Sequence, residues 1–142
     1  MLKGLDEYLT PELLRALAEM GHGDQIALVD RNYPAFANGS EVIDLPHSSV
    51  ADVLKAILRV FPVDAFPGDP VIHMLQDDGD EGPALAGCRL IWDAAEARTV
   101  DDHGVDRHGE EGFYELAKQA YITIRTGETA PYACFLIPKG VL

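Results

Sequence analysis

Short apolar runs alternate with stretches of helical periodicity along most of this chain. A run of about four to eight apolar residues is typical of a buried strand, whereas apolar positions three and four residues apart indicate a helix face. The predicted strands cover residues 25–29, 41–45, 71–75, 121–125 and 132–137, and the predicted helices cover residues 10–20, 49–61, 84–98 and 110–119. This alternation predicts an α/β fold, a single layered domain with a largely parallel sheet flanked by helices.

The first two helices carry start signals. Thr10 stands where a capping residue is expected, and Pro11 takes the first helical position. Either Ser48 or Ser49 caps the second helix. By contrast, residues 99–109 are polar and favour no particular element.

The length and the charge limit the functions that the chain can serve. Its 142 residues fit one domain over residues 1–142, which can bury a core without disulfide or metal support. The 24 acidic and 11 basic residues give a net charge of −13. Nucleic acids and anionic membranes attract clustered Lys and Arg, so neither is expected as a partner, and a neutral small molecule suits the chain better. The charge also keeps a protein soluble whatever it binds.

The cysteines and the N-terminus indicate a cytoplasmic protein. Cys88 and Cys134 are too few for a disulfide framework and fit a reducing compartment. No secretory signal is visible, and the apolar runs are too short to cross a bilayer. The acidic segment 77–81 has no apolar anchor and lacks EF-hand spacing, so we expect an exposed loop there.

The segment Gly21-His22-Gly23-Asp24 is the first that could carry chemistry. A histidine between two glycines, just past a helix end, lies in an unshielded turn, and imidazole titrates near neutral pH. It therefore suits general acid/base catalysis. From its position alone, a histidine that caps the helix C-terminus is the commoner alternative.

Asp30 follows the almost wholly apolar run 25–29, and ligands of α/β sheets gather at the carboxyl ends of strands. A surface turn or a capping role is equally compatible with this position. An extended segment from residue 25 to residue 30 spans on the order of 20 Å, which puts His22 and Asp30 at opposite ends of one strand. Unless the chain bends sharply, both can contact one small ligand only across a subunit interface.

Other residues are open to a functional or a structural role. Tyr132 can hydrogen-bond to a ligand and stack on it, yet an aromatic residue also suits a strand in the core. Cys134 alternates with apolar neighbours, as a packed thiol does. Arg107 and His108 are adjacent in a polar loop. The histidines show no zinc-ligand spacing, so no metal is expected, and His73 favours a hydrogen-bonded core position inside its strand.

Sequence blocks along the chain resemble the L-fucose mutarotase / D-ribose pyranase family. The blocks are Met1–Gly4, Leu9–Leu14, Leu17–Asp24, Asp30 with Asn32–Pro34, Phe113–Glu115, Thr126–Glu128, Pro131–Tyr132 and Lys139–Val141. They span essentially the whole chain and are densest at its two ends. Gly21-His22-Gly23-Asp24 alone is a weak motif, and the order of the blocks makes the resemblance specific.

The resemblance implies an enzyme that interconverts the α and β anomers, or the pyranose and furanose forms, of a free monosaccharide such as L-fucose. It implies no cofactor and no metal. It also implies rings of identical subunits, typically decamers, with sites near subunit contacts. Carried over residue by residue, His22 matches the proton donor, Asp30 a sugar-hydroxyl ligand and Tyr132 a sugar-contacting tyrosine.

Two positions depart from the family pattern. Cys134 stands where asparagine is usual, and Glu110 stands where fucose members carry arginine, a place that Arg107 or His108 can take if the loop shifts. These departures keep open a sugar-binding accessory protein without turnover. A weaker third alternative is a metal-dependent hydrolase built from the histidine and aspartate residues. The candidate residues are accordingly His22 for catalysis and Asp30, Arg107, His108, Tyr132 and Cys134 for sugar binding.

Overall fold

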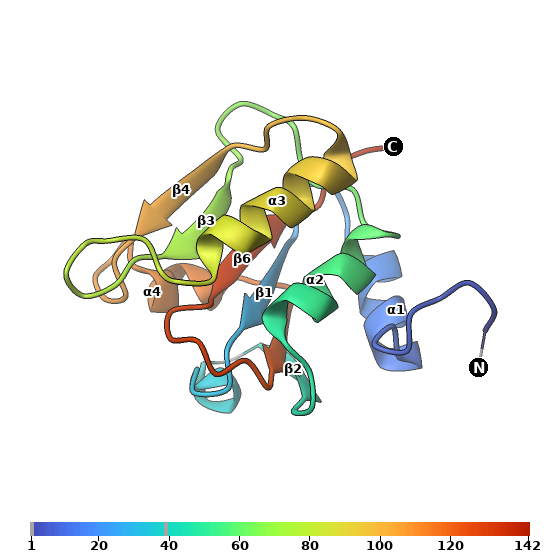
Figure 1. Ribbon diagram of the computed structural model, residues 1–142, viewed down its shortest axis with the longest axis horizontal. Coiled ribbons are helices and arrows are strands. Elements are labelled where there is room, and N and C mark those ends of the chain that lie inside the picture. Colours follow the sequence, from blue (N-terminus) through green and yellow to red (C-terminus); the bar gives the residue numbers. More distant parts are fainter. Residues whose placement is uncertain (1, 39) are drawn as a thin grey trace.

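The computed structural model describes residues 2–38 and 40–142 and has a six-stranded sheet at its centre (Figure 1). The strands are β1 (Gln25–Val29), β2 (Glu41–Leu45), β3 (Val71–Met74), β4 (Asp102–Val105), β5 (Ile122–Thr126) and β6 (Phe135–Pro138). Their order across the sheet is β2-β5-β1-β6-β3-β4. Each strand predicted from the sequence is present, at bounds that differ by a few residues.

The sheet is largely parallel, as predicted. β1 pairs with β5, β5 with β2 and β3 with β4 in parallel, whereas β6 runs antiparallel to both of its neighbours, β1 and β3. In the β1–β6 register, Leu28 lies opposite Phe135. The residue that follows β1 and the residues that precede β6 therefore lie at the same edge of the sheet.

Helices cover both faces of the sheet (Figure 1). They are α1 (Pro11–Glu19), α2 (Val50–Leu58), α3 (Leu85–Glu96), α4 (Phe113–Ala117) and the short 3₁₀ helix η1 (Ala35–Ala37). The first three share an apolar core with Ile26 and Leu28, whereas α4 and η1 pack with Ala27 and Val29. This division follows from the alternation of side chains along β1. No helix in the described ranges is long and apolar enough to cross a membrane.

The predicted helix starts are confirmed. The Thr10 side chain accepts a hydrogen bond from the Leu13 N–H at 3.3 Å, and Ser49, rather than Ser48, accepts one from the Asp52 N–H at 3.1 Å. α2 ends at Leu58, short of the predicted end at residue 61. The backbone before Pro62 cannot remain helical easily, because the proline ring crowds the residue that precedes it.

β4 lies inside residues 99–109, which the sequence pattern left unassigned. It is the strand at one edge of the sheet and pairs with β3, so it needs no alternating apolar pattern. Asp102 accepts hydrogen bonds from Arg89 at 2.7 Å and contacts the buried His73 Nε2 at 3.1 Å. His73 is thus a hydrogen-bonded core residue, as predicted.

Candidate active site

A pocket of about 250 Å³ opens at the carboxyl end of β1. Four of the predicted sugar-binding residues line it: Asp30, Arg107, Tyr132 and Cys134. The other lining residues are Asn32, Tyr33, Met74, Tyr114 and Pro131. The fold therefore brings together in one concave site residues that are widely separated in the sequence.

Asp30 and Cys134 form the buried floor of this pocket. Asp30 is 6% exposed; its Oδ1 accepts a hydrogen bond from the Asn32 N–H at 2.9 Å, and its Oδ2 accepts one from the Cys134 thiol at 3.5 Å. Burial, and after it the charge of Asp30, raises the pKa of the Cys134 thiol well above its usual range. The thiol therefore stays protonated, and because it is a weak donor, Asp30 Oδ2 can still accept a ligand hydroxyl.

Arg107 supplies the positive charge of the pocket. Its Nη2 contacts Asp77 Oδ2 at 3.1 Å, while its Nε is buried without a hydrogen-bond partner in the described part of the chain. A buried donor left unpaired costs about 1–3 kcal/mol, so an oxygen of a ligand would stabilise this arrangement. Glu110 is exposed and does not line the pocket. Of the two basic candidates near this position, Arg107 is the one in the pocket.

The acidic segment 77–81 is exposed, as expected. Ion pairs, rather than apolar contacts, attach it to the rest of the protein. Glu81 contacts Arg89 at 2.7 Å, and Asp77 contacts Arg107. The neighbouring Gly82 lies so close to Tyr132 that an added Cβ would be 3.2 Å from the Tyr132 Cβ. This loop therefore supports the pocket at two of its lining residues.

The aromatic residues of the pocket include two that sequence reasoning missed. Tyr33 and Tyr114 pack with ring centroids 5.4 Å apart, and burial raises the pKa of both phenols, so both stay neutral hydrogen-bonding groups. Both lie in the sequence blocks that resemble the family, and these blocks gave the only signal for them in the sequence. His108 is not in the lining; its ring packs edge-on against Tyr114, with centroids 5.3 Å apart.

Tyr132 has an unusual backbone conformation. Its φ is +60°, a left-handed value that a bulky side chain rarely adopts. Such conformations cost on the order of 1–3 kcal/mol and persist where the surrounding structure holds them. The Cys134 N–H donates to the Tyr132 carbonyl oxygen at 2.9 Å, which closes the turn that leads into β6.

His22 lies at the other end of β1 and is absent from the pocket lining. Its Nε2 is 3.0 Å from Oδ2 of Asp64, and its ring packs against Phe66 with centroids 5.0 Å apart. The His22 side chain is 41% exposed, whereas that of Asp64 is 1% exposed. A partly exposed imidazole is thus held against a buried carboxylate.

The alternative role of His22 as a helix cap finds no support in these contacts. Lys139 Nζ donates to the carbonyl oxygens of Leu17, at 2.8 Å, and Met20, at 2.6 Å. The lysine therefore satisfies the carbonyl groups at the C-terminus of α1. The His22 ring is therefore not needed to cap α1.

Asp64 had not been singled out from the sequence, because an aspartate shortly after a helix end carries no motif of its own. With His22 and the exposed Asp69 it forms a group whose possible ligand atoms lie within 4.8 Å of one another. Such a group could in principle hold a cation. Both oxygens of Asp64 are, however, already engaged, one with His22 and the other with the Phe66 N–H at 3.1 Å.

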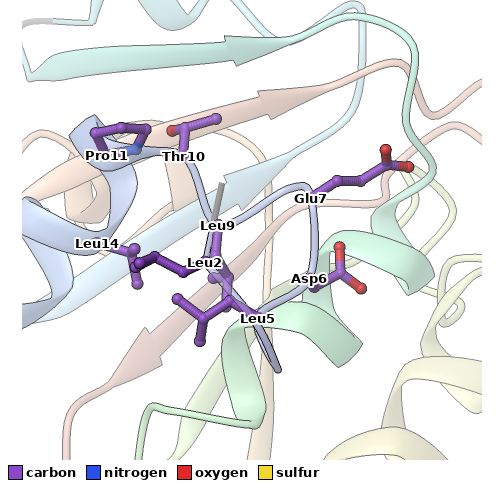
Figure 2. A pocket seen from close by; sticks show the side chains of 8 residues that line it. All are labelled: Leu2, Leu5, Asp6, Glu7, Leu9, Thr10, Pro11 and Leu14. Carbon is purple, nitrogen blue, oxygen red and sulfur yellow. The ribbon is translucent and has the colours of Figure 1, made fainter.

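A separate hollow of about 380 Å³ lies beside the N-terminal segment. Figure 2 shows its leucines, Leu2, Leu5, Leu9 and Leu14, gathered together, with the carboxylates of Asp6 and Glu7 directed away from them. It contains none of the predicted site residues. We therefore place the candidate site at the pocket of Asp30 and at His22.

The fold and these two clusters define a class of small α/β protein with a polar pocket at one end of its central strand and a histidine–aspartate pair at the other. The chain matches the RbsD / FucU transport protein family over residues 3–142 and belongs to that family. The resemblance predicted from the sequence blocks is thereby confirmed.

Solved structures agree with this assignment. The fucose mutarotase of Streptococcus pneumoniae, solved in complex with L-fucose, is 33% identical, with a TM-score of 0.89 and 99% of each chain covered. FucU of Bifidobacterium longum is 36% identical, with the same TM-score and coverage. RbsD of Bacillus subtilis, complexed with D-ribose, is 23% identical with a TM-score of 0.71 over 100% of this chain and 99% of that one, a likeness of fold alone.

Proposed function

We propose that this protein is a cytoplasmic mutarotase that interconverts the α and β anomers, or the pyranose and furanose forms, of L-fucose or a related free monosaccharide. The observation that carries the proposal is the pocket that unites Asp30, Arg107 and Tyr132 in the fold of a fucose mutarotase. A carboxylate, a guanidinium and a phenol offer the acceptors and donors that sugar hydroxyls need. A tyrosine ring also provides a face for the sugar ring.

The reaction requires one proton to move between two oxygens of the sugar. On ring opening, the anomeric hydroxyl loses its proton, the bond between C1 and the ring oxygen breaks, and the ring oxygen gains a proton. Closure on the other face of the carbonyl reverses these events. An imidazole can both take up and release a proton, so it serves both directions, and such catalysis contributes about 10² to 10⁴-fold. His22 takes this role, and no cofactor or metal is needed.

The separation of His22 from the pocket supports a site shared between subunits. β1 lies between His22 and Asp30, and five extended residues span roughly 17 Å. A monosaccharide in the pocket of one subunit would therefore meet His22 of a neighbour. We propose a closed ring of identical subunits, a decamer as the family resemblance implies, in which each contact completes one site.

Saturation transfer between the NMR signals of the two sugar anomers tests the function. The wild-type protein should exchange the anomers of L-fucose, or of another sugar in a small panel, faster than buffer does. His22→Ala should remove the catalysed exchange and leave the fold intact, because His22 lies in a turn. His47→Ala, at an exposed histidine outside the site, is the matched control. Full exchange by His22→Ala would overturn the assignment of His22.

A sugar-binding accessory protein is the second candidate function. Two observations favour it: Cys134 provides only a thiol at the pocket floor, and no histidine in the described part of the same chain lines the pocket. Sugar binding without exchange above the buffer rate would establish this alternative. The third and weaker candidate is a metal-dependent hydrolase. Full exchange activity in a metal-stripped preparation would eliminate it.

A further inference from the structure

We infer that Asp64 is the positioning residue for His22, and that its carboxylate fixes the imidazole so that Nδ1 is the atom that exchanges protons with the sugar. The inference rests on the proposed function for its catalytic consequence. The arrangement of the two side chains can be tested independently of any activity.

The geometry of the pair assigns the hydrogen atom. A carboxylate accepts hydrogen bonds and has no proton to donate, so the 3.0 Å contact requires a hydrogen on Nε2 of His22. In the neutral ring Nδ1 then carries the lone pair. The described part of the chain gives Nδ1 no hydrogen-bond partner, so that atom remains available to a ligand.

The two side chains differ in how far they are enclosed. The turn of His22 is held by the Gly23 N–H, which donates to the Lys139 carbonyl oxygen at 2.9 Å, but the His22 side chain is 41% exposed. Asp64 is held by its N–H, which donates to the Pro138 carbonyl oxygen at 3.0 Å, and by its own carbonyl oxygen, which accepts from Arg98 at 3.1 Å, and its side chain is only 1% exposed. The more enclosed side chain of the pair is therefore the aspartate, and it orients the histidine.

Contacts around the pair limit the ring further. Oδ1 of Asp64 accepts the Phe66 N–H at 3.1 Å, and the Phe66 ring packs on the imidazole. The Asp64 carboxylate thus cannot rotate away without losing a hydrogen bond, and the His22 ring cannot turn without losing its contacts with Asp64 and Phe66. An orienting carboxylate that selects one tautomer of a catalytic histidine is a known device in other enzymes.

This arrangement accounts for the proton balance of the proposed reaction. Neutral His22 takes the proton of the anomeric hydroxyl at Nδ1, and the resulting imidazolium returns it to the ring oxygen as the bond from C1 to that oxygen breaks. Throughout, Asp64 keeps its hydrogen bond to Nε2 and stabilises the transient positive charge. The same atom serves ring closure in reverse.

Nitrogen-15 NMR of the His22 ring tests the inference first. In the wild-type protein, at a pH where the ring is neutral, we expect Nε2 to be protonated and Nδ1 to be unprotonated. Asp64→Asn should change this tautomer preference, because an amide can also present a donor to Nε2. A wild-type ring protonated on Nδ1 would overturn the inference, even if the protein is an active mutarotase.

Exchange kinetics test the catalytic consequence. Asp64→Asn, and Asp64→Ala if it folds, should lower kcat at least about tenfold and leave KM within about twofold, because Asp64 acts on His22 and not on the bound sugar. Asp69→Asn removes a neighbouring exposed carboxylate without touching the hydrogen bond to Nε2, so its tautomer and kcat should match the wild type. The inference would be overturned if Asp64→Asn keeps the wild-type tautomer and kcat, or if the variant raises KM and leaves kcat unchanged. Full activity in His22→Ala would instead refute the proposed function.

Discussion

Sγ of Cys134 lies 3.5 Å from Oδ2 of Asp30, in the same pocket, because the antiparallel pairing of β1 and β6, with Leu28 opposite Phe135, brings the end of β1 and the start of β6 to the same end of the sheet. An asparagine at residue 134 would present an amide with two donors and an acceptor in place of a weak thiol donor. We expect Cys134→Asn to lower KM for at least one sugar of the panel by about tenfold, the scale of one good hydrogen bond.

The matched control for this change is Cys88→Ala, since Cys88 is also buried but lies on α3 outside the pocket. It should leave the order of preference among the sugars unchanged. Equal KM values for every sugar in Cys134→Asn and the wild type would show that residue 134 does not contact the ligand.

Arg107 has a buried Nε without a partner in the described residues and a single ion pair at the pocket rim. We expect Arg107→Lys to raise KM about tenfold or more, because lysine has no planar fork of donors. Asp77→Asn should change KM by less than about twofold, since the pair that it breaks is solvent-exposed. Initial rates over a range of sugar concentrations would measure both, and an unchanged KM in Arg107→Lys would remove Arg107 from the site.

Gly82 packs against Tyr132 at a distance that leaves little room for a side chain. Gly82→Ala would push on a residue already at φ +60°, so we expect a several-fold rise in KM with the fold retained. Gly87→Ala is the control: nothing lies within 4 Å of its added Cβ, and alanine in α3 should stabilise the protein by about 0.5–1 kcal/mol. If both variants keep the wild-type KM, the loop does not position Tyr132.

The buried His73 makes stability depend on pH. Burial lowers its pKa below 6.5, although the neighbouring Asp102 opposes this shift. The unfolded chain therefore binds more protons than the folded one as pH falls below about 6.5, and the free energy of unfolding falls with it. His73→Gln should remove a part of this loss between pH 7.5 and pH 5.5, because glutamine does not titrate.

Denaturant titrations at these two pH values measure the effect. His103→Gln, at an exposed position on β4, should keep the wild-type dependence on pH. A His73→Gln variant that loses as much stability as the wild type would show that another group causes the dependence.

The central part of the fold was predictable because burial leaves a clear periodicity. Residues 26–29 are all apolar and buried, since helices cover both faces of β1. β4 was not predictable in this way: a sheet edge tolerates polar residues, and its Asp102 is stabilised by Arg89 and His73, which are distant in the sequence. The antiparallel direction of β6 likewise depends on contacts that a local pattern does not encode.

The candidate site was predictable only in part, because it too depends on contacts between residues that are distant in the sequence. Asp30 follows a buried strand, and this position alone indicates the edge where ligands gather. Asp64 acquires its importance only when folding brings it to His22, which is far from it in the sequence. The distance between His22 and Asp30 followed from the length of an extended strand, and the structure indeed leaves His22 out of the pocket that contains Asp30.

Mixing two inactive variants tests the shared site most directly. His22→Ala and Asp30→Asn should each be inactive alone, because each removes one half of every site. After joint dissociation and reassembly, about a quarter of the contacts between subunits should combine a wild-type His22 with a wild-type Asp30, and anomer exchange should return to about that fraction of the wild-type rate. Mixed oligomers that form, as a tagged subunit can show, and yet remain inactive would contradict a site built from two subunits.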